Sequence, residues 1–514
     1  MASTAAIGLV SPGSFTEESA TSALPFFSTA DVRWQRAYDR ALNVLANNVQ
    51  VLPRFPDPVL IEGSSYAGIW QECGPHESLV YRHFRPDVAR NGHMTFFALQ
   101  RPDGQLPANN KRTETGFGQI QMVVPIAATA WELAQATGDS ELLQKAYDSC
   151  ARWDAWLMRY RNTRGTGLIE GFCTYDTGMD NSPRWAGFAP QCPDKDARRC
   201  PDNPALPRLC PDLSATVYGA RTALAAMATA LGKNNEAAQW HERAQTLRGL
   251  ILQRLYDSED AAFYDVDAQN HFVKVRSDIM SRICGEHIVD GATFAAIWER
   301  QLGNPHAFWA PFPLPSIALD DPTFVRPIPR NSWGGASQAL TALRAGRWMD
   351  FYGRSAEFAH MQQQWCEALQ RDMTFRQQLD PLTGEFTQAD QPNYSPAALV
   401  MYDYTWRLVG VREEGDELHW NVRPSSASSR AAVFRLTLSN GNSAGMRYTD
   451  NGAEITLAGH KLGEVMGTAR VVTDKTGRGL YALGIDLSPQ PLEVRLKGAH
   501  RRFTLPANAR EHLA

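Results

Sequence analysis

Apolar residues recur at spacings of three and four through most of the first four hundred residues, which predicts amphipathic helices. The clearest run is DVRWQRAYDRALNVLANN at 31–48, and Ser28 and Thr29 precede it as candidate N-caps. Further helices are predicted at 117–137, 140–159, 213–232, 235–256, about 289–302, 333–346, 353–371 and 394–409. Polar connections rich in Gly and Pro separate them. Helices that arrive in pairs between such loops predict an array of helical hairpins.

The pattern changes to short alternating runs near Val411. Segments such as ELHWNVRP, AVFRLTLSNGN and LEVRLKG alternate apolar and polar residues, and Asn440-Gly441 and Asn451-Gly452 are turn signals between them. About seven strands over this length predict an antiparallel β-sandwich. We therefore expect a flexible lead-in at 1–30, a helical domain at 31–410 and a β-sandwich domain at 411–514.

Composition narrows the possible partners. The chain has 514 residues, a net charge of −4, 43% hydrophobic and 21% charged residues, as expected for a globular protein of two domains. This charge gives no electrostatic reason to expect nucleic acid or an anionic membrane as partner. No run approaches the roughly 20 apolar residues of a spanning helix. The N-terminal segment lacks the basic and apolar regions of an export signal, which leaves both the cytoplasm and the periplasm open. The oligomeric state is not determined.

The eight cysteines do not form a metal-binding pattern. Cys192, Cys200 and Cys210 cluster in one Pro- and Asp-rich loop, without the paired CxxC spacing of a structural zinc site. A disulfide from Cys192 to Cys200 or Cys210 is one interpretation, and free thiols are the other. We expect no metal and no cofactor.

The most informative segment is TYDTGMDNSPRW at 174–185. It places two carboxylates, Asp176 and Asp180, four residues apart in a loop that also contains Gly178 and Pro183. Aspartates in turns and at helix N-caps are common, so an ordinary structural role is an alternative.

This segment resembles the general-acid motif of glycoside hydrolase family 63 and of the mannosylglycerate-hydrolase-like enzymes, and it is similar to the signature of family 37 trehalases. The resemblance implies an (α/α)6 toroid of helical hairpins. It also implies that Asp180 protonates the leaving glycosidic oxygen and that Asp176 binds sugar. A negative charge at Asp176 would help to keep Asp180 protonated.

Three further segments match the same family in the expected order. Trp70-Gln71-Glu72 with His76-Glu77 resembles the first active-site loop, and 329–335, which contains Trp333, resembles a loop before a late helix. The third segment, Asp380 to Glu385 followed by Tyr394 and Tyr404, resembles the last active-site loop and helix. The resemblance covers roughly residues 60 to 410.

The sequence departs from the family at the general base. The family has Glu three residues before the Asp-Pro of the last loop, and this chain has Gln377 there. A glutamine cannot accept the proton of an attacking water. Either a neighbouring carboxylate (Glu385, Asp390, Glu72 or Glu77) is the base, or the reaction differs, or the site binds sugar without turnover. We favour Glu385 as the base.

The resulting hypothesis is an inverting glycosidase that cleaves a small α-glucoside or α-mannoside. The predicted catalytic residues are Asp180 and Glu385. The predicted substrate-binding residues are Trp70, Glu72, Glu77, Gln119, Gln121, Asp176, Asn181, Arg184, Trp333, Gln377 and Tyr404. Gln119 and Gln121 are expected to open a helix, with amides that suit vicinal hydroxyls. A lyase or epimerase on the same scaffold is an alternative, but those enzymes use His or Tyr bases, and only His76 and His287 are candidates. A non-catalytic sugar-binding relative is the second alternative.

Overall fold

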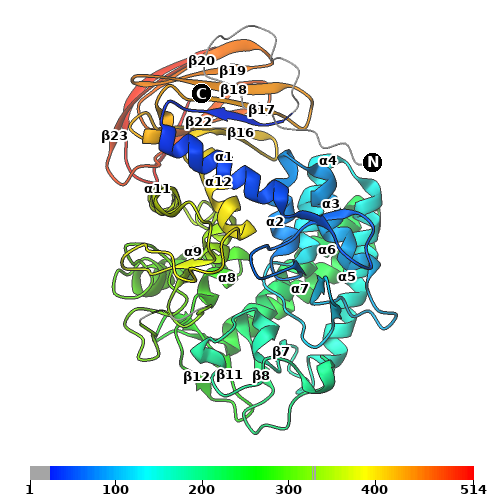
Figure 1. Ribbon diagram of the computed structural model, residues 1–514. Coiled ribbons are helices and arrows are strands. Elements are labelled where there is room, and N and C mark those ends of the chain that lie inside the picture. Colours follow the sequence, from blue (N-terminus) through cyan, green and yellow to red (C-terminus); the bar gives the residue numbers. More distant parts are fainter. Residues whose placement is uncertain (1–23, 327, 329–330, 514) are drawn as a thin grey trace.

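The computed structural model describes residues 24–326, 328 and 331–513. It consists of a helical region followed by two antiparallel sheets, which lie together at one end of the molecule (Figure 1). The helices are α1 (Val32–Asn47), α2 (Gly74–Val80), α3 (Pro86–Ala98), α4 (Ile126–Thr137), α5 (Ser140–Tyr160), α6 (Pro211–Ala230), α7 (Asn234–Arg254), α8 (Ile279–Gly285), α9 (Gly291–Ile297), α10 (Ala339–Arg344), α11 (Ser355–Asp372) and α12 (Ser395–Val409).

Burial divides these helices into two classes. Every residue of α12 except Arg407 is buried, whereas the long helix α7 buries only Trp240, Ala244, Leu247 and Ile251. An amphipathic helix covers a core with one stripe, and a helix buried on all sides lies within that core. The pairs α6 with α7, α4 with α5 and α11 with α12 pack against each other. This pairing agrees with the predicted helical hairpins.

Several helix boundaries differ from the sequence prediction. Residues 117–125 are not helical, and α4 begins only at Ile126, after Gly118, Pro125 and a left-handed Gln121. Helix α10 begins at Ala339 and not at 333, because Gly334 and Gly335 disfavour helix. The short helices α2, α3 and α8 were not predicted. The N-cap of α1 is Asp31, whose carboxylate accepts from Trp34 N at 2.8 Å, in place of Ser28 or Thr29.

Short strand pairs connect the helices. They are β2 (Val49–Val51), β3 (Pro58–Leu60), β4 (Gly68–Trp70), β5 (Asn109–Lys111), β6 (Thr115–Gly116), β7 (Glu170–Gly171), β8 (Arg208–Leu209), β9 (Tyr256–Asp257), β10 (Ala262–Phe263), β11 (Asp265–Val266), β12 (Phe272–Val273), β13 (Ser337–Gln338) and β14 (Gln378–Leu379). The pairing of β4 with β5, and of β13 with β14, brings loops from distant parts of the sequence together.

The C-terminal region contains more strands than predicted. Its strands are β15 (Val411–Glu414), β16 (Glu417–Val422), β17 (Val433–Thr437), β18 (Ser443–Thr449), β19 (Gly452–Leu457), β20 (His460–Met466), β21 (Ala469–Asp474), β22 (Gly479–Leu483), β23 (Gln490–Leu496), β24 (Ala499–Leu505) and β25 (Arg510–His512). Together with β1 (Phe26–Ser28), they form a seven-stranded and a five-stranded sheet. The turns at Asn440-Gly441 and Asn451-Gly452 lie between strands, as predicted.

The prediction of a flexible lead-in over 1–30 is wrong for its last residues, which form a strand. Strand β1 (Phe26–Ser28) adds to the edge of the seven-stranded sheet, where Phe27 pairs with Phe434 of β17. Phe27 is buried there against Tyr38 of α1. Burial of these aromatic rings joins the start of the described chain to the C-terminal region. The earlier residues of the lead-in, 1–23, lie outside the described residues.

Candidate active site

The loop at 172–185 is held in place by two buried ion-pair groups. Asp176 is fully buried and forms two hydrogen bonds with Arg161, at 2.5 and 3.1 Å. It also accepts hydrogen bonds from the backbone N–H groups of Ile120, Phe172 and Cys173. These five donors occupy its carboxylate. The prediction that Asp176 binds sugar is therefore wrong, because its oxygens point into the protein interior.

Arg184 has the same kind of structural role. Its guanidinium is 2% exposed and binds both Asp212 and Asp265 through hydrogen bonds of 2.5 to 2.8 Å. Two carboxylates balance one buried guanidinium, so no hydrogen-bonding capacity is directed at a ligand. The prediction that Arg184 binds substrate is wrong for this reason.

Asp180 differs from these residues because its carboxyl group is only partly buried. Its hydrogen bond with Asn331 is long, 3.4 Å from Nδ2 to Oδ2. Burial, followed by repulsion from Glu72, raises the pKa of Asp180 to about 7, and the Asn331 contact acts weakly in the opposite direction. An aspartic acid that is protonated near neutrality is suited to general acid catalysis. The charge that raises this pKa comes from Glu72, and not from Asp176 as predicted.

Glu72 lies directly beneath this loop. Its Oε2 is so close to Gly178 that a Cβ added to that glycine would clash with it, which explains why residue 178 has no side chain. Burial raises the pKa of Glu72, and Arg344 and Arg282 oppose the rise. Its Oε2 has no hydrogen-bond partner among the described residues. Glu72 therefore has a buried carboxylate oxygen without a donor directly against the loop that carries Asp180.

A chain of amide and hydroxyl groups connects Asp180 to Gln377. Asn331, which contacts Asp180, accepts at Oδ1 from Gln377 Nε2 at 3.1 Å, and the Tyr66 hydroxyl donates to Gln377 Oε1, also at 3.1 Å. Asn181 donates to the backbone oxygen of Asn331 at 2.9 Å. One amide and two hydrogen bonds thus separate Asp180 from Gln377. That span is compatible with the roughly 6.5–9.5 Å between acid and base in an inverting glycosidase.

Gln119 and Gln121 lie in irregular chain before α4 and not at a helix start as predicted. Both are buried, and Gln119 donates to Gln121 at 2.8 Å while accepting from Gln191. Gln121 in turn lowers the pKa of Glu72. Of the two, Gln121 is the one that the structure places beside the candidate site.

The two tryptophans predicted to bind substrate have different surroundings. Trp70 is partly exposed and meets Tyr66 edge to face, with ring centroids 5.8 Å apart. Trp333 is buried, and the Arg282 guanidinium lies over its ring at 5.3 Å. Trp70 is therefore the tryptophan whose ring a ligand can reach, whereas the ring of Trp333 packs against Arg282 in the interior.

Three other predicted site residues have no described contact with Asp180. Glu385 is exposed in the turn at 380–385, and its described hydrogen bonds stay within that turn. Tyr404 is fully buried and donates to the backbone oxygen of Ala342. Glu77 is fully buried at the start of α2. The burial and hydrogen bond of Tyr404 contradict its predicted role as a sugar ligand, whereas the role of Glu385 as base stays a prediction.

The sequence analysis missed four residues that help to form the site. Tyr66 and Tyr175 are partly exposed, and Asp180 acts on the pKa of both. Arg282 and Arg344 are buried on α8 and α10, and both act on Glu72. A charged residue at an otherwise apolar helix position was the available signal for the two arginines.

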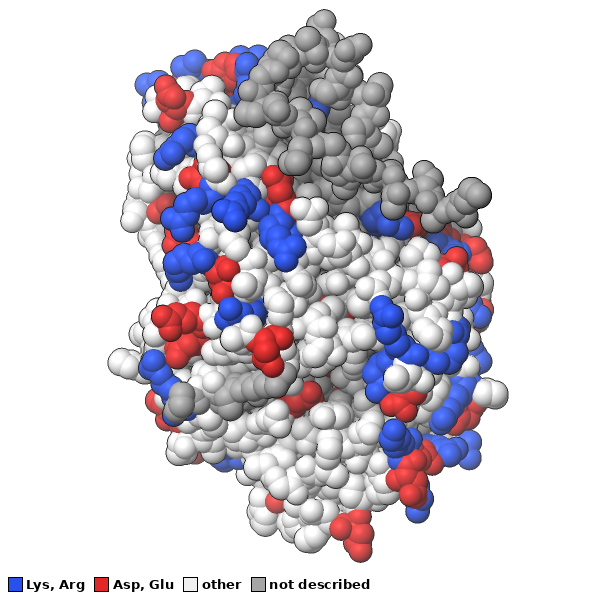
Figure 2. All heavy atoms as spheres, in the orientation of Figure 1, with Lys and Arg blue, Asp and Glu red and all other residues white. Residues whose placement is uncertain are grey.

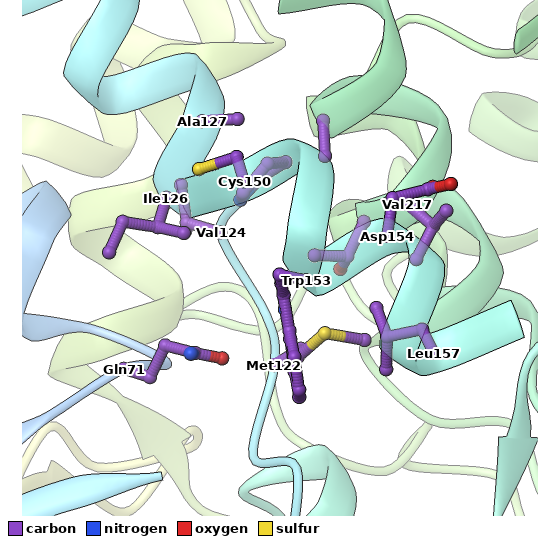
Figure 3. A pocket seen from close by; sticks show the side chains of 13 residues that line it. Gln71, Met122, Val124, Ile126, Ala127, Cys150, Trp153, Asp154, Leu157 and Val217 are labelled. Carbon is purple, nitrogen blue, oxygen red and sulfur yellow. The ribbon is translucent and has the colours of Figure 1, made fainter. Parts of the chain in front are cut away.

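The molecule also contains a small cavity and a large groove outside this site. The cavity has a volume of about 20 Å³ and lies between apolar side chains such as Met122, Trp153 and Leu157, with Gln71 at one side (Figure 3). It has room for about one water and none for a sugar. The groove, of about 800 Å³, lies where the helices meet the sheets and contains His76 and His287. Neither histidine acts on Asp180.

The surface carries charges of both signs. Figure 2 shows Lys and Arg mainly along the two sides of one face, interspersed with Asp and Glu, while the middle is mostly uncharged. Among the described residues, no helix combines the length and apolarity needed to cross a membrane.

Comparison with known proteins relates residues 66–406 to the family described as "Mannosylglycerate hydrolase MGH1-like glycoside hydrolase domain". Mannosylglycerate hydrolase MGH2 of Selaginella moellendorffii is 34% identical over 79 residues, which is 14% of this chain and 15% of that protein. The chain thus matches less than a sixth of the length of this curated relative.

Solved structures show the same fold at low identity. A protein described as a sialidase matches 86% of this chain and 40% of its own, with a TM-score of 0.63 and 16% identity. The GH63 mannosylglycerate hydrolase from Thermus thermophilus matches 71% of this chain and 100% of its own, with a TM-score of 0.58 and 18% identity. Neutral trehalase Nth1 from Saccharomyces cerevisiae matches 71% of this chain and 80% of its own, with a TM-score of 0.54 and 13% identity. The predicted resemblance to both families is confirmed.

Proposed function

The chain belongs to the MGH1-like glycoside hydrolase family, and from this premise we propose that it hydrolyses the α-glycosidic bond of a small α-glucoside or α-mannoside. The observation that carries the proposal is Asp180, a partly exposed carboxyl group with a pKa of about 7 on the loop that resembles the family's acid motif. We propose that its helices form the (α/α)6 toroid of the six-hairpin glycosidases. Pairing of α4 with α5, α6 with α7 and α11 with α12 supports this arrangement.

The likeness to the Thermus thermophilus enzyme guides the choice of substrate. That enzyme has been solved with glucose and with D-glycerate. In this chain, Trp70 offers a ring face, and Glu72, Gln121 and Gln377 offer carboxylate and amide groups to hydroxyls. A single sugar with a small aglycone is the size of ligand that these groups can surround.

In the proposed reaction, Asp180 donates its proton to the leaving oxygen. For the base we propose a carboxylate other than the exposed Glu385. Glu72 is the candidate from the sequence that shares the site with Asp180, and its Oε2 lacks a hydrogen-bond partner within the described part of the chain. Arg344 and Arg282 favour its ionised form, while repulsion from Glu72 favours protonated Asp180. Burial raises the pKa of both carboxyl groups, so the opposing effect of the two arginines on Glu72 is what favours Glu72 as the base and Asp180 as the acid. We assign the base role to Glu72 and an inverting outcome to the reaction.

The test is a product assay on α-glucosides and α-mannosides, including the glycerate glycosides, with the anomer of the released sugar followed by NMR. We expect the inverted anomer from the wild type. Asp180→Asn should lower kcat by roughly 10²–10⁴-fold on glycosides with poor leaving groups. It should keep most of its activity on an α-glycosyl fluoride, because fluoride leaves without protonation.

Glu72→Gln separates the two roles. A base is needed for every leaving group, so this variant should lose activity on the fluoride as well. Full activity of Glu72→Gln on the fluoride would show that the base is another group, and release of the retained anomer would refute the inverting mechanism.

A second function is favoured by one observation, the amide of Gln377 at the family's base position. A sugar-binding protein without turnover would need no base. Calorimetric binding of a sugar to a folded protein that releases no product from any panel substrate would support this function and refute hydrolysis.

A further inference from the structure

Three buried side chains form a cluster behind the candidate active site. Glu62 follows β3, and Cys73 and Glu77 lie at the start of α2. One ligand atom from each residue lies within 4.8 Å of the other two. The exposed fractions of the residues are 5%, 1% and 0%.

The hydrogen bonding of this cluster is incomplete. Glu62 Oε1 accepts from the Tyr394 hydroxyl at 3.0 Å and faces the Cys73 sulfur at 3.4 Å. The Cys73 thiol lowers the pKa of Glu77, but neither buried oxygen of Glu77 has a hydrogen-bond partner of normal geometry among the described residues. A buried carboxylate without a donor carries the whole cost of its desolvation. The Glu77 carboxylate therefore needs a positive partner.

We propose that Glu62, Cys73 and Glu77 bind a zinc ion. Zinc accepts both thiolate sulfur and carboxylate oxygen, whereas magnesium and calcium bind oxygen ligands. The Tyr394 hydroxyl, which donates to Glu62, would orient that carboxylate from outside the ligand set. Binding releases to solvent the thiol proton of Cys73 and the protons that burial keeps on Glu62 and Glu77.

The charge balance supports a divalent cation. A thiolate and two carboxylates carry three negative charges. The guanidinium of Arg344 acts electrostatically on both Cys73 and Glu77 and supplies one positive charge. A zinc ion would offset two of the three negative charges, and Arg344, which also acts on Glu72, offsets part of the third. The alternative is that protons neutralise the cluster, and the experiment below separates the two.

A second group of similar composition does not satisfy the same conditions. Cys173, Asp176 and Cys192 also lie within reach of one another. Asp176, however, already accepts five hydrogen bonds, two of them from Arg161. The two sulfurs are 3.8 Å apart, so they form a thiol contact and not a disulfide. This group serves as the control.

The position of the zinc site suggests what it does. Residues 63–72 connect Glu62 to Cys73, and this loop carries Tyr66, Trp70 and Glu72 of the candidate active site. A metal bound to both ends of the loop fixes the distance between them and restricts the loop in the folded protein. This consequence rests on the proposed function, whereas zinc binding itself does not.

The first measurement is the metal content of the full chain, purified without a metal-affinity step, by inductively coupled plasma mass spectrometry. We expect about one zinc per chain in the wild type and in the control Cys192→Ser. Cys73→Ser and the isosteric Glu77→Gln should lose it. Zinc retained in both variants, or lost only in Cys192→Ser, would overturn the proposal.

Chelator-treated wild type provides a second test that does not depend on the folding of a variant. Added ZnCl2 should raise its Tm by several degrees, and added Co2+ should produce a thiolate-to-cobalt charge-transfer absorption that Glu77→Gln weakens. A metal-free protein whose Tm does not respond to zinc would show that protons neutralise the cluster. Zinc binding without any glycosidase activity would refute only the proposed function, so the two failures can be distinguished.

Discussion

The raised pKa of Asp180 predicts that replacing this residue by Asn stabilises the protein in a pH-dependent way. In the folded state the pKa is about 7, against 3.8 for an unperturbed Asp. A carboxyl group with a raised folded-state pKa binds its proton more tightly when the protein is folded. Its contribution to stability is therefore most favourable at low pH and falls as the pH rises from about 4 to about 7. Asn carries no such pH-dependent cost.

The size of the effect follows from the same shift. Three pKa units correspond to an upper limit of about 4 kcal/mol at alkaline pH. Asp180 is partly exposed, and solvent screening reduces this limit to roughly 1–3 kcal/mol. Asp180→Asn should thus be more stable than the wild type at pH 8, and the difference should shrink towards pH 4.

The assay is urea denaturation of the wild type and of Asp180→Asn at pH 5, 6, 7 and 8, with midpoints compared at equal m-values. Asp148→Asn is the matched control, since Asp148 is exposed on α5. A midpoint difference that does not change with pH, or a destabilised Asp180→Asn at pH 8, would refute the reasoning. In an active enzyme, the same pKa should appear as the alkaline limb of kcat/KM near pH 7.

Three further outcomes test other parts of the structure. Asp176→Asn leaves Arg161 without its buried counter-charge and should lower the free energy of unfolding by about 3–5 kcal/mol. KM should not change. A raised KM in a variant of full stability would show that Asp176 binds sugar after all. Glu385→Gln should leave kcat within twofold of the wild type in the product assay, and a loss beyond tenfold would return Glu385 to the mechanism. Gln377→Glu places a negative charge near Asp180 and should move the alkaline limb of the pH profile upward; an unchanged limb would show that Gln377 is too distant to act.

The sequence predicted the long helices and the strand-rich C-terminal region because their patterns are local. Helices such as 31–48 and 140–159 show a regular spacing of apolar residues, and turns such as Asn440-Gly441 carry their own backbone preference. The short helices α2 and α8 escaped prediction. They are buried on nearly all sides, and a helix without a polar face has no periodic pattern to detect.

For the site, too, the sequence predicted only what depends on local residues. The motif at 174–185 was sufficient to single out Asp180, but Asp176 lies only four residues away and has the same chemistry in sequence. Only the tertiary structure distinguishes them, because Arg161 and three backbone N–H groups enclose Asp176 while Asp180 remains partly exposed.

What the sequence by itself determined is therefore the class of fold, the family resemblance and the acid loop, all of which are encoded in residues close together along the chain. What only the tertiary structure decided is which carboxylates share a site. Glu72 reaches Asp180 through a gap left by Gly178, and Glu62 meets Cys73 and Glu77 across a folded loop. Protonation and metal affinity depend on distances and burial, and these arise only when separate segments pack together.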